Sequence, residues 1–162
     1  MHTLYVMRHG QAESSAPSDE QRALTPFGVQ QVRKNAQKNL QAKVFDYVFV
    51  SPYLRAQQTW DVIHSVNVEY KQLHTVDWIT PDVATQPALD QLFSLTEKLS
   101  TTPKEKPLLI LFVCHQTFAG RFITHLCGGA RHGIHVDTGA IVNTNTEVFA
   151  AQCGTLIDTY NT

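Results

Sequence analysis

Several features that define whole protein classes are scarce in this sequence of 162 residues. Cysteine occurs only as Cys114, Cys127 and Cys153, an odd number with no Cys-x-x-Cys pair. A disulfide framework is therefore not expected, and reduced thiols in the cytosol fit better. No apolar run approaches the roughly 20 residues that a membrane-spanning helix needs. The N-terminus lacks the basic leader of a signal peptide. These absences predict a cytoplasmic protein that does not associate with a membrane.

An excess of charge of one sign is lacking as well. The chain has 13 Lys and Arg against 14 Asp and Glu, which gives a net charge of -1 with His neutral. Because the basic residues form no run, a nucleic-acid surface is not expected, and any anion must be bound locally. Hydrophobic residues make up 43% of the chain, enough for a sizeable core. We expect one domain over residues 1–162, and a monomer.

Strand and helix patterns alternate along the chain. Buried strands are expected at 4–7, 47–50 and 108–113, and shorter strands at 69–73, 140–142, 147–149 and 155–157. Helices are expected at 26–42, 54–63, 88–99 and 117–126, with a loop at 11–23, irregular structure at 77–87 and a linker at 101–107. Thr25 and Pro26 form a good helix start. The alternation predicts an α/β fold, a three-layer sandwich with a mostly parallel central sheet flanked by helices.

Three segments with chemically capable side chains follow predicted strands: Arg8-His9, Ser51 to Arg55, and His115-Gln116. In parallel sheets, ligands bind beyond the carboxyl ends of the strands. Arginine forks onto phosphate oxygens, and histidine acts as nucleophile or acid/base near neutral pH. Gln116 lies where the N–H groups of a helix start can add to anion binding. The set predicts a phosphate site with a nitrogen nucleophile. Ser51 is expected to cap the next helix or to turn its hydroxyl to the site.

Four landmarks in order carry a family resemblance: Arg8-His9-Gly10, Leu24-Thr25-Pro26-x-Gly28, Ser51-Pro52-x-x-Arg55-Ala56-x-Gln58-Thr59 and Val113-Cys114-His115. Together they resemble the histidine phosphatase superfamily, which has the phosphoglycerate-mutase-like fold. The stretch from Ser51 to Thr59 and the short chain look most like the SixA-type phosphohistidine phosphatases within it.

The resemblance implies a role for each matching residue. His9 attacks phosphorus and is transiently phosphorylated, Arg8 and Arg55 hold the equatorial oxygens, and His115 donates to the phosphoryl group. Water then frees the phosphate. No metal and no cofactor are implied, because two arginines and a second histidine supply the positive field.

Larger relatives carry an acidic general acid in the middle of the chain, and no residue here matches it clearly. Asp77, Asp19 and Glu20 are the candidates. An alkoxide leaving group benefits from a positioned acid by roughly 10²–10⁴-fold, whereas imidazole, with a pKa of about 6.5, can leave already protonated. The missing match therefore favours a phosphohistidine-bearing protein as substrate, such as a histidine-phosphotransfer domain or phosphocarrier of two-component signalling. The short chain leaves little material for a lid, which points the same way.

Other readings stay open. The enzyme could instead be a small-molecule phosphomonoesterase or mutase of the same superfamily, or the domain could bind phosphate without turnover. Cys114 is expected to face the core if His115 faces the site, because neighbouring strand residues point to opposite faces. A looser group of metal-ligand types follows no strong zinc spacing, so no metal site is expected there: His125, Cys127, His132 and His135.

Overall fold

The computed structural model describes residues 1–99, 106–129 and 133–162. The elements are β1 (His2–Arg8), a short 3-10 helix η1 (Asp19–Gln21), α1 (Pro26–Asn39), β2 (Val44–Val50), α2 (Leu54–His64), β3 (Glu69–Thr75), α3 (Gln86–Leu99), β4 (Leu109–Cys114), α4 (Phe118–Cys127), β5 (Ile141–Thr146) and β6 (Gly154–Tyr160). Strands and helices alternate up to β5, so the predicted α/β class is confirmed.

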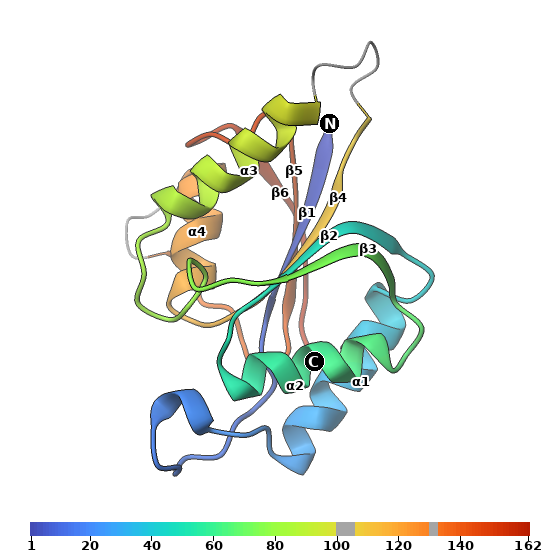
Figure 1. Cartoon of the computed structure of the whole chain (residues 1–162), viewed down its shortest axis with the longest axis vertical. Coiled ribbons are helices and arrows are strands. Elements are labelled where there is room, and N and C mark those ends of the chain that lie inside the picture. The colour runs from blue at the N-terminus through green and yellow to red at the C-terminus, as the bar shows by residue number, and fades with distance from the viewer. Residues whose placement is uncertain (100–105, 130–132) are drawn as a thin grey trace.

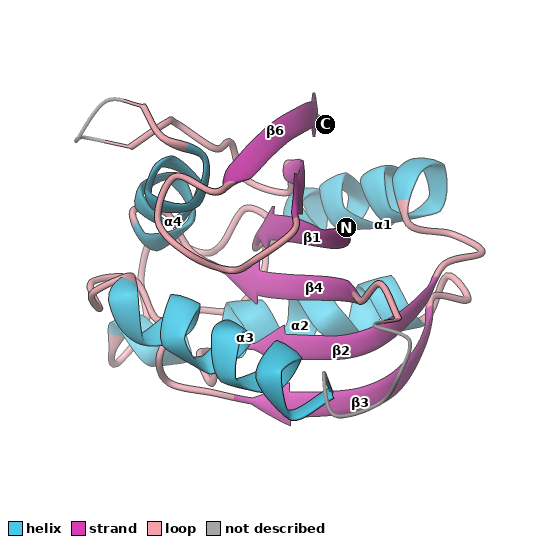
Figure 2. Ribbon diagram, turned by 90° about the horizontal axis from the view of Figure 1, so that it is seen from above, coloured by secondary structure: helices cyan, strands magenta, loops and turns pink. Residues whose placement is uncertain are grey.

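The strands form one mixed, mostly parallel sheet. Their order is β3-β2-β4-β1-β5-β6. Strands β1 to β4 run parallel, β5 is antiparallel to β1, and β6 is antiparallel to β5. Helices α1 and α2 cover one face of this sheet and α3 and α4 cover the other, as Figures 1 and 2 show. The predicted three-layer sandwich is confirmed.

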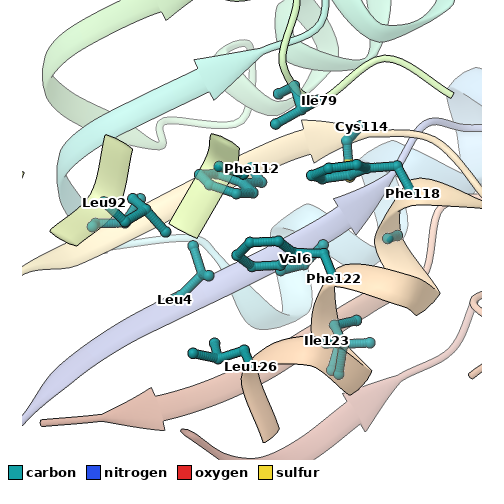
Figure 3. Packing of buried hydrophobic residues seen from close by; sticks show 14 of the residues in the cluster. Leu4, Val6, Ile79, Leu92, Phe112, Cys114, Phe118, Phe122, Ile123 and Leu126 are labelled. Atoms are coloured by element: carbon teal, nitrogen blue, oxygen red, sulfur yellow. The ribbon is translucent and has the colours of Figure 1, made fainter. Parts of the chain in front are cut away.

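The two central strands divide their side chains between the two faces. Along β1, Leu4 and Val6 pack toward α3 and α4, while Tyr5 and Met7 pack toward α1 and α2. Figure 3 shows Phe112 of β4 with the aromatic side chains of α4 in the first of these clusters. Strands buried on both faces must be apolar throughout, which is why β1 and β4 have the clearest strand patterns in the sequence.

The carboxyl ends of β1, β4 and β2 meet at one edge of the sheet. The His9 N–H donates to the Cys114 carbonyl at 3.0 Å, and the Ser51 N–H donates to the Val113 carbonyl at 3.1 Å. From this edge β1 leads to α1 on one face and β4 leads to α4 on the other. Such a divergence opens a crevice where ligands bind in α/β proteins.

Two element predictions are wrong, and the segment expected as a loop at 11–23 contains the short 3-10 helix η1. The helix expected to 42 ends at Asn39, and Ala42 has a positive φ of 64°, which no helix accommodates. The strand expected at 147–149 is instead a turn, although Phe149 is buried. The Thr146 hydroxyl bonds to the carbonyls of Val148 and Cys153 and closes this turn, while the polar residues before it form β5. Most of the predicted linker, 101–105, lies outside the described residues.

Two glycines allow the loop after β1 to lie against the start of α1. Thr25 caps α1 by accepting from the Gly28 N–H at 2.9 Å, as predicted, with Pro26 in the first turn. A Cβ on Gly10 would lie 2.5 Å from the Gly28 carbonyl oxygen, and a Cβ on Gly28 would lie 2.1 Å from the Gln11 carbonyl oxygen. The backbone at Gly10 and Gln11, immediately after His9, is therefore in direct contact with the backbone of α1 at Gly28.

The substitution Gly28→Ala should disturb both stability and the site. Its methyl group would overlap the Gln11 backbone, so we expect a loss of about 1–3 kcal/mol in the free energy of unfolding together with reduced activity. Chemical denaturation measures the first effect. Gln30→Ala, on the exposed side of the same helix, is the matched control; equal stability of the two variants would contradict the packing argument.

Candidate active site

The structure brings four predicted residues together at the carboxyl edge of the sheet. Arg8 ends β1 and His9 follows it, Arg55 lies in the first turn of α2, and His115 follows β4. The rings of His9 and His115 have centroids 5.0 Å apart, and Arg55 Nε donates to His9 Nε2 at 3.1 Å. His9, Arg55 and His115 are buried, so these polar groups face one another in an environment of low dielectric.

The hydrogen bonds of His9 define its tautomer. Nδ1 lies 2.7 Å from the Gly10 carbonyl oxygen, which can only accept, so Nδ1 carries the proton. Nε2 is then the nitrogen that carries the lone pair, and it accepts from Arg55 Nε. Burial, helped by the positive charges of Arg55 and Arg8, lowers the pKa of His9 to about 3. At neutral pH the ring is therefore uncharged, which is the state that a nitrogen nucleophile requires.

His115 is held by Ser51. His115 Nε2 lies 2.7 Å from Ser51 Oγ, and the Tyr53 N–H approaches the same hydroxyl at 3.4 Å. A hydroxyl that accepts from Tyr53 can give its own proton to Nε2, which favours a proton on Nδ1. Among the described residues, Nδ1 of His115 has no hydrogen-bond partner. Burial, followed by the charges around it, lowers the pKa of His115 to about 2.

The two arginines provide the positive charge of the site. Arg8 uses its guanidinium to donate to the Val136 carbonyl at 2.9 Å, while its buried Nε has no partner in the described part of the chain. Arg55 donates to the Asp19 carbonyl oxygen at 2.5 Å and to the Asp19 carboxylate at 3.0 Å. A guanidinium has five N–H groups, so both side chains retain donors for an anion.

Asp19 is ionised in this arrangement. Partial burial raises the pKa of Asp19, but hydrogen bonds from Arg22 and Arg55 outweigh it and hold the pKa below its usual value. Its carboxylate accepts from both arginines. A carboxylate in this state is a poor proton donor.

The side chain of Gln116 forms a hydrogen bond outside the group of the four other predicted site residues. Its Nε2 donates to the Ile134 carbonyl at 3.0 Å, and α4 begins two residues later at Phe118. Cys114, in contrast, packs fully buried among the residues that face α3 and α4, as predicted, and burial raises the pKa of its thiol to about 12. It is not an activated nucleophile.

Ser51 and Thr59 have larger roles than the sequence indicated. Ser51 was expected to cap or to face the site; the cap position of α2 is occupied by Tyr53, and Ser51 orients His115. Thr59 accepts from the Gly10 N–H at 3.2 Å and donates to the Arg55 carbonyl at 2.7 Å. The four-residue spacing of Arg55 and Thr59, which places both on one helix face, was the available signal.

The described residues offer neither a clustered metal-ligand set nor a membrane-spanning helix. Within residues 1–99, 106–129 and 133–162, no group of three or more His, Cys, Asp or Glu side chains is placed to hold a metal ion. His132, one of the four residues weighed as ligands, lies outside these ranges. No helix in the same ranges is long and apolar enough to cross a membrane.

Comparison with known proteins gives consistent matches. A family model described as Histidine phosphatase superfamily (branch 1) matches residues 4–77. The chain is 30% identical over 136 residues to the phosphohistidine phosphatase SixA homolog of Haemophilus influenzae, with 77% of each chain covered. It is 30% identical over 127 residues to phosphohistidine phosphatase SixA of Escherichia coli, covering 78% of this chain and 74% of that protein. A structure of the protein histidine phosphatase SixA with tungstate superposes with a TM-score of 0.82 at 24% identity, covering 98% of this chain and 96% of that chain.

A histidine pair flanked by two arginines, at the carboxyl edge of a mostly parallel sheet, is an arrangement suited to phosphoryl transfer. This chain belongs to the histidine phosphatase superfamily. The resemblance predicted from its four landmarks is confirmed, and with it the enzyme class, a phosphatase among the hydrolases.

The protonation of the two histidines can be measured directly. In ¹⁵N–¹H correlation spectra, we expect His9 to remain the neutral Nδ1–H tautomer from pH 8 down to pH 5, because its pKa is lowered to about 3. A titration of His9 with a midpoint near 6.5 would contradict the assignment. Since the unfolded chain protonates these histidines first, their contribution to stability should be lost as the pH falls from about 6.5 toward 3.

Ser51→Ala should release His115 without removing it. The lost hydrogen bond corresponds to about 1 kcal/mol, so we expect kcat to fall several-fold with a smaller change in KM. Ser51→Thr, which keeps a hydroxyl, should retain more activity than Ser51→Ala. Steady-state kinetics on the phosphorylated substrate check this, and wild-type kcat in Ser51→Ala would show that the contact does not position His115.

Proposed function

We propose that this protein is a phosphohistidine phosphatase in which His9 carries the phosphoryl group transiently. The observation that supports this most strongly is the state of His9: its Nδ1 proton is committed to Gly10, and its Nε2 lone pair lies beside Arg55. The comparisons with SixA proteins support the same activity.

The first step transfers the phosphoryl group to His9. Nε2 forms a bond to phosphorus while the bond from phosphorus to the substrate imidazole breaks. A substrate ring that is protonated on its other nitrogen leaves as neutral imidazole. His9 then carries phosphorus on Nε2 and a proton on Nδ1, and the Gly10 carbonyl stabilises the positive ring. Arg8 and Arg55 hold the equatorial oxygens, and His115 donates from Nδ1.

The second step hydrolyses the phosphohistidine intermediate. The oxygen of a water molecule forms a bond to phosphorus, the bond to His9 Nε2 breaks, and the electron pair returns to the nitrogen. The proton of the water goes to inorganic phosphate. No step needs a metal ion or a cofactor, because Arg8, Arg55 and His115 supply the stabilising charge.

The substrate class is inferred from whether the leaving group needs a proton donor. Asp19 is held as a carboxylate by two arginines, and an ionised carboxylate cannot protonate an alkoxide. Asp77 and Glu20 remain candidates for that role, but a phosphohistidine substrate does not need one. The expected substrate is therefore a phosphohistidine-bearing protein, such as a histidine-phosphotransfer domain or a phosphocarrier in two-component signalling.

Further parts of the proposal concern the context of the enzyme. We place it in the cytoplasm, as a monomer formed by one domain over residues 1–162, without nucleic-acid or membrane partners. Gln116 contributes to phosphate binding through the backbone at the start of α4, since its side-chain nitrogen is bonded to Ile134.

The test is phosphate release from a phosphohistidine protein and a phosphoserine protein, measured side by side with EDTA present. We expect release from phosphohistidine only, with loss of at least about 10³-fold in His9→Ala because the nucleophile is removed. Rapid quenching should trap an acid-labile phosphoryl group on the wild-type protein.

Either of two other outcomes would favour an alternative function. Equal or faster release from phosphoserine would point to a working general acid and to a phosphomonoesterase or mutase. Binding of phosphate without release from either substrate would point to a non-catalytic phosphate-binding domain.

A further inference from the structure

Two grooves lie next to each other near the mouth of the site and the edge of the sheet. A groove of about 370 Å³ is lined by Pro52 and by the residues from Thr75 to Trp78. Pro52 lies between Ser51 and Tyr53, and the Tyr53 ring lies 5.0 Å from His115. A second groove of about 330 Å³ shares Val76 and Trp78 with the first. The two grooves are therefore neighbours, and the first lies beside the segment that holds Ser51 and Tyr53.

The second groove lies between α3 and the strands β2 and β3, and aromatic rings line its sheet side. We call it the aromatic groove: Tyr47, Phe49, His74 and Trp78. Phe49 lies 5.5 Å from His74 and 5.1 Å from Trp78, measured between ring centroids. Strand β3 forms this edge of the sheet, and its residues are exposed along their whole length. Partly exposed Tyr and Trp side chains are typical of protein–protein contacts, because they bury much area at a small entropic cost.

The mouth of the site carries carboxylates from three segments. We call this set the acidic rim: Asp19, Glu20, Asp77 and Asp82. Asp19 is fixed by Arg55, and Asp77 lines the first groove. Asp82 lies in a loop attached to α4, since Thr117 donates to the Pro81 carbonyl at 3.3 Å and Arg121 donates to the Val83 carbonyl at 3.0 Å.

The pKa of Tyr53 shows that several of these carboxylates lie near the mouth of the site. Burial raises the pKa of Tyr53, and the negative charges of Glu20, Asp19 and Asp82 raise it further against the opposing charge of Arg55. Among these carboxylates, Asp19 is partly neutralised by Arg22 at 2.9 Å. The site thus has a positively charged floor, formed by Arg8 and Arg55, inside a negative rim.

This charge pattern restricts what can approach. A phosphoryl group is drawn to the arginines, but a small polyanion must pass the carboxylates on its way. When positive charges lie beside the phosphoryl group, the arginines attract the phosphoryl group and the acidic rim attracts those positive charges. Complementary charge of this kind acts mainly on the encounter rate and on partner choice.

We propose that the acidic rim and the aromatic groove form the docking surface for the phosphohistidine-bearing protein, which presents basic side chains next to its phosphohistidine and an apolar side chain to the groove. This inference rests on the proposed function. It adds the chemistry of the partner: phosphohistidine flanked by Lys or Arg, on a segment with an apolar side chain that fits between the rings.

The charge half is tested with three phosphohistidine peptides of equal length, chemically phosphorylated, with Lys, Ala or Glu on both sides of the modified residue. We expect kcat/KM to fall in the order Lys, Ala, Glu, by about tenfold in total at low salt, and the difference to shrink at about 1 M salt. Asp82→Lys should reduce the preference. Asp158→Lys, an exposed aspartate on β6 at the opposite edge of the sheet, should keep it.

The groove half is tested with Gln91→Trp, which fills the aromatic groove from an exposed position on α3. The control is Gln30→Trp, exposed on α1 on the other face. We expect KM for a phosphorylated histidine-phosphotransfer domain to rise about tenfold in Gln91→Trp only, while kcat/KM for free phosphohistidine stays unchanged in both variants.

The outcomes separate this inference from the function on which it rests. If the wild-type protein hydrolyses free phosphohistidine but shows no preference among the peptides, and Gln91→Trp leaves the KM for the domain unchanged, the docking surface is wrong and the proposed function stands. If it hydrolyses none of these substrates, both are wrong.

Discussion

The hydrogen bond from His9 Nδ1 to the Gly10 carbonyl decides which nitrogen of His9 is available. It depends on the position of the Gly10 peptide, and that position is set by several contacts. The Gly10 N–H donates to Thr59, and the absence of a Cβ lets Gly10 lie against the Gly28 backbone. The Nε2 lone pair is therefore oriented by contacts among β1, α1 and α2 and not by His9 alone. In the proposed mechanism, this rigid support would let His9 attack with little reorganisation.

The site combines buried neutral rings with the positive charge of the buried Arg55 and the half-buried Arg8. Burial lowers the pKa values of His9 and His115, so both rings are neutral, whereas the guanidinium groups of Arg8 and Arg55 beside them carry positive charge. Asp19 supplies part of the balancing charge. Arg8 Nε and His115 Nδ1 are left without partners in the described residues, and buried donors without partners are costly. Under the proposed function, the oxygens of a phosphoryl group would accept from these donors, so the same groups that are costly to bury would favour binding of an anion.

Much of the fold and of the site could be predicted from the sequence. Continuous apolar runs identified β1, β2 and β4, and Thr25 with Pro26 identified the start of α1. The prediction failed where a side chain closes a turn: Phe149 looks like a strand residue because it is buried, yet the Thr146 hydroxyl bends the chain before it. It also understated Ser51, since nothing local shows that the hydroxyl reaches a histidine 64 residues away.

The sequence by itself determined the residue types of the site and their positions after strands, because strand periodicity and the chemistry of arginine and histidine are local properties. Only the tertiary structure decided which nitrogen of His9 carries the proton, that Asp19 is paired with Arg55, and that Ser51 holds His115. Those facts depend on the order in which β1, β4 and β2 lie side by side, and on loops that approach one another across the sheet edge. Contacts between residues far apart in the chain leave no periodic signal, so they become visible only when the chain is folded.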